Sequence, residues 1–147
     1  MEQDYSKYTD EMLVKEWKEG LDLDEIMFFI LGELASRKHP KTKEFCLESL
    51  SRDLGYDEFF VSSALGSLYS YDEESAIDFA RNNYKKFHIY SLGSLISLLW
   101  QDSEQENSEK KKELIKLIKA HLKTLKRSEI TEIQDDYDSF MKAYKNI

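Results

Sequence analysis

The 147-residue sequence contains only one proline and five glycines, so few residues interrupt regular structure, and helices are favoured over many short strands. Its single cysteine, Cys46, cannot form an internal disulfide bond, which is typical of a reducing compartment. The longest uninterrupted apolar run, Ile26–Leu31, has six residues, whereas a membrane-spanning helix needs about 20. The first residues lack the basic flank and apolar core of a signal peptide. These absences predict a helical, cytoplasmic protein with a packed thiol.

Length and composition predict one folded domain over residues 1–147. The sequence is 41% hydrophobic and 13% aromatic, which is enough apolar material for a sizeable core. The formal net charge is −8, and a field of this sign repels phosphate groups and attracts cations. We therefore expect a basic protein as partner rather than a nucleic acid or a membrane, and a monomer in the free state.

Apolar residues recur every three or four positions along nearly the whole chain, as one face of a helix requires. The pattern predicts an all-α fold of about eight helices in antiparallel pairs, over residues 9–20, 24–38, 40–55, 57–71, 72–83, 87–101, 108–126 and 128–144. A strand is the alternative for Ile26–Leu31, but the helical pattern continues through Lys38. No low-complexity tract or domain linker separates the segments.

Polar side chains mark the expected helix starts, because their oxygen atoms accept the open N–H groups of a first turn. These positions are Thr9, Asp22 or Asp24, Asp57, Asp72, Ser108 and Ser128. Pro40 suits the first turn of its helix, where the missing N–H is harmless. Gly20, Gly55 and the pair Asn82 and Asn83 are expected helix ends, since glycine and asparagine tolerate the left-handed cap conformation.

Three helices contain the same short segment, L-G-x-L, with its glycine at Gly32, Gly66 and Gly93. A glycine inside a helix costs about 1 kcal/mol relative to alanine. The recurrence therefore predicts a close approach of a neighbouring helix, where a side chain would not fit. The alternative is coincidence in a chain rich in leucine and serine.

Residues 61–68, V-S-S-A-L-G-S-L, and residues 73–80, E-E-S-A-I-D-F-A, form two expected helices joined by a short turn. This pair resembles the A-helix and B-helix of HEAT-type repeats. The resemblance covers roughly Asp24–Lys126 in three units, with glycine spacings of 34 and 27 residues that are shorter and less regular than usual. It implies a right-handed stack of antiparallel helix pairs, a HEAT-like α-solenoid, whose open end is covered by Trp17 of the first helix.

Motifs of catalytic or cofactor chemistry are missing from the sequence. The L-G-x-L glycines lack the clustered glycines and the lysine of a phosphate-binding loop. Neither a C-x-x-C pair nor a G-x-S-x-G elbow occurs, and His39, His88 and His121 lack the i, i+4 partners of a zinc site. His121 lies on an apolar stripe and is expected in the core or at its boundary. We expect no enzyme, cofactor or metal, while hydrolytic carboxylate pairs stay open among 29 acids.

Charge is distributed unevenly along the chain. Residues 1–106 carry 22 acidic and 11 basic side chains, residues 107–127 carry 2 and 8, and residues 128–147 carry 5 and 2. The basic residues of the middle range are Lys110, Lys111, Lys112, Lys116, Lys119, Lys123, Lys126 and Arg127. Basic amphipathic helices can bind membranes or nucleic acids. Here we expect instead a solvated outer face, offset by acidic neighbours and lying close to the acidic last helix.

Three acidic clusters are candidates for binding a protein partner. They comprise Asp72, Glu73 and Glu74 in a turn between helices, Asp102, Glu104 and Glu106 in the polar loop 101–107, and Asp135, Asp136 and Asp138 in the last helix. Tyr69, Tyr71 and Tyr137 stand beside two of the clusters, and tyrosine adds contact area at low entropic cost. We predict a partner-binding set of Tyr69, Tyr71 and the nine acids. The alternative is acids that cap helix starts, next to ordinary surface tyrosines.

A small, acidic, helical-repeat chain without catalytic motifs resembles the immunity proteins of bacterial toxin–immunity pairs, including those of contact-dependent growth inhibition. Such proteins cover the cationic substrate-binding face of a toxic nuclease. The resemblance implies electrostatic steering of a basic toxin onto the acidic surface, followed by steric block. A HEAT-like adaptor in an endogenous complex is the second interpretation, and a helical-repeat nucleic-acid hydrolase, against which the net charge argues, is the third. An apolar patch around Tyr90 or Trp100 is the alternative docking surface.

Overall fold

The computed structural model describes residues 4–19, 24–53 and 58–147, and all regular structure within these ranges is helical. Its elements are the short 3-10 helices η1 (Tyr5–Lys7) and η2 (Tyr84–Lys86) and the α-helices α1 (Asp10–Glu19), α2 (Asp24–Ser36), α3 (Lys41–Asp53), α4 (Glu58–Tyr71), α5 (Glu73–Asn83), α6 (Ile89–Gln101), α7 (Glu109–Leu122), α8 (Arg127–Glu132) and α9 (Gln134–Ala143). The predicted all-α fold is confirmed, and Ile26–Leu31 is helical rather than a strand. None of the described helices is long and apolar enough to cross a bilayer.

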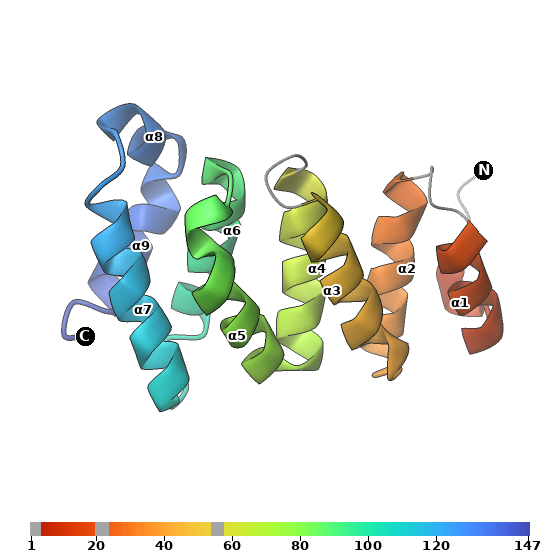
Figure 1. Cartoon of the computed structure of the whole chain (residues 1–147). Helices are drawn as coiled ribbons and strands as arrows, with labels where there is room; N and C mark the ends of the chain where they lie inside the picture. Colours follow the sequence, from red (N-terminus) through yellow and green to blue (C-terminus); the bar gives the residue numbers. More distant parts are fainter. Residues whose placement is uncertain (1–3, 20–23, 54–57) are drawn as a thin grey trace.

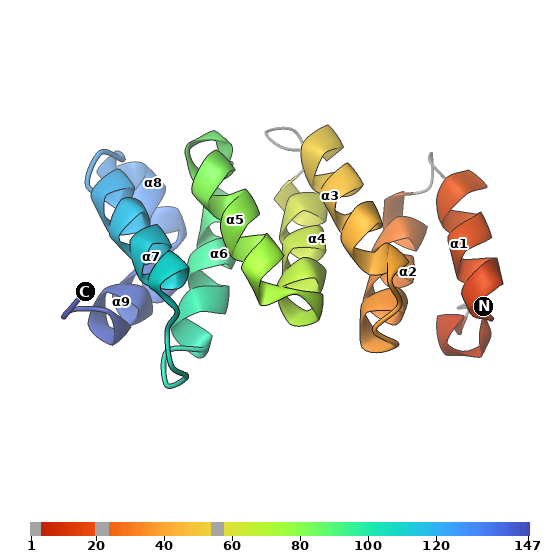
Figure 2. The ribbon, with the colours of Figure 1, turned by 60° about the horizontal axis from the view of Figure 1, so that its bottom comes forward.

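The helices stand side by side in a row that runs from α1 at one end to α8 and α9 at the other (Figure 1). Helices α1, α3, α5 and α7 form one layer of this row, and α2, α4, α6 and α9 form the other (Figure 2). Direct contacts link α2 to α4, α4 to α6, α6 to α9 and α5 to α7. The layers are therefore filled in chain order. The right-handed, HEAT-like character of the stack and the single domain stay predictions.

Side-chain caps confirm three of the expected helix starts. The side-chain oxygens of Thr9, Asp72 and Ser108 each accept a hydrogen bond of 3.2 Å from the backbone N–H three residues further along the chain. Each bond satisfies one donor that a first helical turn leaves open. Pro40 directly precedes α3. Asp24 is the first residue of α2, while its side chain and the predicted positions Gly20, Asp22, Gly55 and Asp57 fall outside what the structure describes.

The C-terminal helices differ from the prediction. Helix α7 ends at Leu122 rather than Lys126. The backbone of Lys126 is extended (φ −69°, ψ 148°) and its N–H donates to the carboxylate of Glu129 at 3.2 Å, so that α8 begins before the predicted Ser128. Ile133 (φ −125°, ψ 28°) then leaves the helical conformation and separates α8 from α9. The described residues consequently form nine α-helices where the sequence predicted about eight.

Helix α5 ends at Asn83, which confirms the predicted helix end, but the predicted left-handed cap conformation is wrong. Asn83 has a φ of −134°, and the chain continues into η2. Its side-chain Nδ2 instead donates to the carbonyl oxygen of Phe79 at 2.9 Å, which satisfies an acceptor that the helix end leaves open. Among the described residues other than glycine, positive φ occurs at Lys38 alone (56°), in the connection from α2 to α3.

The predicted close approach at the L-G-x-L glycines is confirmed at one of three positions. A Cβ atom placed on Gly93 of α6 would lie 2.6 Å from Cγ2 of Ile133. A Cβ atom on Gly32 or Gly66 would meet nothing within 4 Å, so the prediction is wrong for α2 and α4. The difference arises because the break between α8 and α9 places Ile133 on the face of α6, and no neighbouring group comes as near to the other two glycines.

An apolar core extends from Leu13 in α1 to Tyr144 after α9. Trp17 is buried and stacks on Phe45 of α3, with ring centroids 4.9 Å apart, so α1 closes its end of the row through Trp17. The predicted packed thiol is also confirmed, because Cys46 is fully buried and burial raises its pKa to about 12.

Candidate protein-binding surface

Two of the three acidic clusters meet at one edge of the fold. The turn between α4 and α5 and the loop between α6 and α7 both lie along the lower edge of Figure 1. Acidic residues of the two segments also contact the same side chains, Tyr69 and Lys111. We call this surface the acidic edge. Its residues are Asp72, Glu73, Glu74, Asp102, Glu104 and Glu106.

Tyr69, near the end of α4, connects the two acidic segments. Its hydroxyl group lies 2.9 Å from Oδ2 of Asp102 and 3.1 Å from Oε1 of Glu73, within hydrogen-bond distance of both carboxylates. Burial, the hydrogen bond to Asp102 and the two negative charges raise the pKa of Tyr69 above its ordinary value. The hydroxyl group therefore stays protonated and serves as a donor inside the fold rather than as a contact offered to a partner.

Lys111 of α7 supplies the positive charge at the same point. Its side chain is only 1% exposed, and its Nζ lies 3.0 Å from Oδ2 of Asp102 and 3.5 Å from Oε1 of Glu73. The ammonium group also lies 5.9 Å from the centre of the Tyr69 ring. Burial of Asp102 favours its protonated form, but the hydrogen bonds from Lys111 and Tyr69 outweigh this effect and lower the pKa of Asp102. The Asp102 carboxylate is thus held in its charged form.

Other acids of this edge are also partly paired within the chain. Lys110 lies 2.8 Å from Glu74 and 3.5 Å from Asp78 of α5, and the hydrogen bond to Glu74 is the main cause that raises the pKa of Lys110. Asp72 accepts hydrogen bonds from the hydroxyl and N–H groups of Ser75, which lower the pKa of Asp72. The ion pairs with Lys110 therefore offset part of the negative charge of the acidic edge.

The two remaining carboxylates face solvent, and one of them, Glu106, lines a small recess. Glu104 and Glu106 in the α6–α7 loop are exposed. The recess has a volume of about 310 Å³ and is lined by Glu73, Glu74, Ile77, Glu106, Ser108 and Lys110. Three of these six side chains are carboxylates around one apolar residue. Because Ile77 is buried and Lys110 already pairs with Glu74, the recess offers an entering cationic side chain carboxylate oxygens rather than an apolar contact.

The third acidic cluster lies apart from the acidic edge, against α6. Asp136 accepts a hydrogen bond from Nε1 of Trp100 at 3.0 Å, and Asp135 and Asp138 are exposed on α9. The hydroxyl group of Tyr90 lies 2.6 Å from the carboxylate of Glu132. The polar atoms of the alternative docking residues, Tyr90 and Trp100, thus face the C-terminal helices. Tyr71 and Tyr137 are both half-buried.

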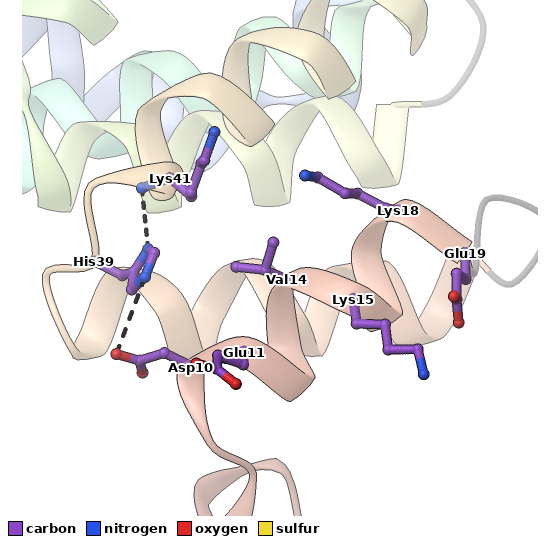
Figure 3. A pocket seen from close by; sticks show the side chains of 8 residues that line it. All are labelled: Asp10, Glu11, Val14, Lys15, Lys18, Glu19, His39 and Lys41. Carbon is purple, nitrogen blue, oxygen red and sulfur yellow. Dashed lines mark hydrogen bonds and ion pairs between the residues drawn. The ribbon is translucent and has the colours of Figure 1, made fainter.

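A second recess, which sequence reasoning did not identify, lies between α1 and the connection from α2 to α3 (Figure 3). It has a volume of about 440 Å³ and is lined by Asp10, Glu11, Val14, Lys15, Lys18, Glu19, His39 and Lys41. Nδ1 of His39 accepts a hydrogen bond from the N–H of Lys41 at 3.1 Å, and Nε2 lies 4.0 Å from Asp10. Since lysines and carboxylates alternate around Val14, this recess does not extend the acidic edge.

Sequence reasoning also missed the role of the basic helix. It predicted a solvated outer face, which fits the exposed Lys116 and Lys123 but is wrong for the buried Lys111. The acids that pair with Lys110 and Lys111 come from α5 and the α6–α7 loop. The apolar periodicity of this helix indicated the burial of Lys111, because Lys111 stands three residues before Leu114 and four before Ile115, on the apolar stripe.

Within the described ranges, no three His, Cys, Asp or Glu side chains form a group that would hold a metal ion. No protein-family model, curated protein or solved structure matches this chain.

Proposed function

We propose that this chain is a non-catalytic protein-binding module that docks a cationic protein on its acidic edge, and that it serves as the immunity protein of a toxin. One observation carries the proposal. Two acidic segments separated by about 30 residues of sequence meet at one edge of the fold, where Glu104 and Glu106 remain exposed beside a recess lined by carboxylates. Such a surface attracts positive charge over a distance of about 8 Å at physiological salt.

The proposed mechanism has two steps. Exposed carboxylates first steer a basic protein to the acidic edge and raise its association rate. The body of the helical row then covers the cationic surface on which the toxin binds its substrate. Neither step requires a catalytic group or a cofactor.

Charge reversal at exposed acids tests this mechanism. The variant Glu104→Lys/Glu106→Lys changes the net charge by four and alters two loop side chains that face solvent. A matched control is Glu16→Lys/Glu48→Lys, which makes the same change at exposed positions of α1 and α3. Asp102 is unsuitable for reversal, because it neutralises the buried Lys111.

We expect the edge variant to slow association with a basic partner protein isolated by pull-down by about tenfold, and the control to slow it much less. Surface substitutions of this kind change stability by about 0.5 kcal/mol or less, so both thermal midpoints should stay close to wild type. Association rates at two salt concentrations are the measurement. Equal effects of the two variants would contradict docking at the acidic edge.

A genetic experiment separates an immunity protein from a HEAT-like adaptor. An immunity gene should stand beside a toxin-encoding reading frame; deletion of this gene with that neighbour intact should then harm the cell, and co-deletion of the neighbour should relieve the harm. A harmless single deletion would favour the adaptor.

The basic helix gives a further check on the partner class. Lys110 and Lys111 are paired with acids inside the chain, and the net charge is −8. We expect no complex with RNA or DNA in a mobility-shift assay at physiological salt. A tight, salt-sensitive shift would replace the protein-binding proposal with a nucleic-acid one.

A further inference from the structure

Lys111 is almost completely buried, which is rare for a lysine side chain. Its side chain is 1% exposed, whereas the neighbouring Lys110 is 47% exposed. Removing an ammonium group from water costs several kcal/mol unless close charges and hydrogen bonds compensate. An apolar side chain would fill the same space without this cost, and the placement therefore requires an explanation beyond packing.

Lys111 and the three side chains around its ammonium group come from four different segments of the chain. Tyr69 belongs to α4, Glu73 to α5, Asp102 follows α6, and Lys111 itself belongs to α7. The negative charges of Asp102 and Glu73 also act, together with burial, to raise the pKa of the Tyr144 hydroxyl group, after α9, to about 12. One buried charge thus connects the ends of helices that are distant in sequence.

The side chains of Glu73 and Asp102 contact groups inside the fold and are also partly exposed to solvent. Oε1 of Glu73 and Oδ2 of Asp102 are the atoms that contact both Tyr69 and Lys111. The same side chains are nevertheless 46% and 28% exposed. The carboxylates are therefore fixed from inside while they still contribute to the surface.

We propose that Lys111 is the positioning residue of the acidic edge. From inside the fold, it holds Glu73 and Asp102 together and so sets the spacing between the α4–α5 turn and the α6–α7 loop. A cationic partner meets a surface whose geometry is established before binding, which reduces the ordering cost of association. The relevance for binding rests on the function proposed above, whereas the positioning itself is a property of the free protein.

Three variants test the positioning. Lys111→Met removes the charge and keeps a long apolar side chain in the buried site. Tyr69→Phe removes one hydroxyl group and leaves every charge in place. Lys112→Met is the matched control, because Lys112 is the next residue and contacts Glu109 at 3.5 Å rather than the acidic edge.

The measurements are made on the free protein by NMR. They are the carboxyl titration of Asp102 and the amide exchange rates of Ser103 and Gln105, whose N–H groups donate to the carbonyl oxygens of Trp100 and Asp102 at 3.1 Å. In Lys111→Met, we expect the Asp102 titration to move to higher pH, since its positive neighbour is gone, and both amides to exchange about tenfold faster. Tyr69→Phe should change both readouts in the same direction by less, and Lys112→Met should change neither.

The inference is overturned if the Asp102 titration and the two exchange rates are the same in Lys111→Met as in Lys112→Met. A lower thermal midpoint with unchanged titration and exchange also overturns it, because that result describes a purely structural lysine. If Lys111→Met does not fold, Tyr69→Phe decides by the same readouts. Failure of the wild-type protein to bind any cationic partner rejects the proposed function instead, since none of these measurements involves a partner.

Discussion

The contact between Gly93 and Ile133 supports a quantitative prediction. Gly93→Ala would place a methyl carbon 2.6 Å from Cγ2 and 3.4 Å from Cβ of Ile133, whereas carbon atoms normally pack at about 3.5–4.0 Å. Cγ2 is attached directly to Cβ, so a rotation about a distant bond does not relieve the overlap. Overpacking of this kind costs about 1–3 kcal/mol.

Gly66→Ala is the matched comparison. Both glycines lie inside helices, and alanine is favoured there by about 1 kcal/mol. A Cβ atom at Gly66 has nothing within 4 Å, so this variant should gain most of that preference. The helix preference cancels between the two variants, and their free energies of unfolding should differ by the overpacking cost, about 1–3 kcal/mol.

Urea and thermal unfolding of the two variants measure this difference. For a chain of this length, 1 kcal/mol corresponds to roughly 4 °C in the thermal midpoint. The midpoint of Gly66→Ala should rise, and that of Gly93→Ala should lie about 4–12 °C below it. In an Ile133→Ala background, where Cγ2 is absent, Gly93→Ala should no longer destabilise. A midpoint of Gly93→Ala equal to that of Gly66→Ala would refute the docking of Ile133 on α6.

Three further predictions concern ionisable side chains. Asp102→Asn removes the carboxylate nearest to Lys111 and should lower the free energy of unfolding by up to about 3 kcal/mol, whereas Glu104→Gln should be nearly neutral in the same urea titration. Burial and the charge of Lys85 lower the pKa of His121, so protonation favours the unfolded chain. The stability contributed by the neutral imidazole is present above about pH 6.5 and is lost as the pH falls through the lower folded pKa. In urea unfolding, His121→Gln should therefore destabilise less at pH 5.5 than at pH 7.5. Cys46, with its pKa raised to about 12, should react with a thiol reagent at pH 8 only after denaturant is added.

Helix positions were predictable because local signals determine them. The caps at Thr9, Asp72 and Ser108 depend on groups three residues away, and apolar periodicity acts within a single helix. The break at Ile133 was not predictable, because the periodic pattern continues across it. At this break, Ile133 lies against Gly93, which is 40 residues earlier in the sequence. A local sequence pattern contains no information on such a contact.

The candidate surface was predictable in composition but not in arrangement. Sequence identified all six acids of the acidic edge, and their relation to helix starts and loops followed from the expected helices. It did not reveal that the first two clusters meet or that Asp136 instead pairs with Trp100. Those pairings depend on which helices are neighbours in space. Lys111 shows the limit most clearly, since its place on the apolar stripe indicates burial but carries no local sign of its partners Glu73 and Asp102.

The order of the row has a consequence for how the chain folds. Within the described ranges, the main contacts between helices join neighbours in the chain or helices separated by one or two others, and the closure of short loops costs little entropy. Chains with such local contacts fold quickly. A nucleus formed by α4 and its neighbours in the middle of the row can grow in both directions, one helix at a time. In the folded protein, we expect α1, whose main helix contact is with α2 alone, to open before α4, which contacts helices on both sides.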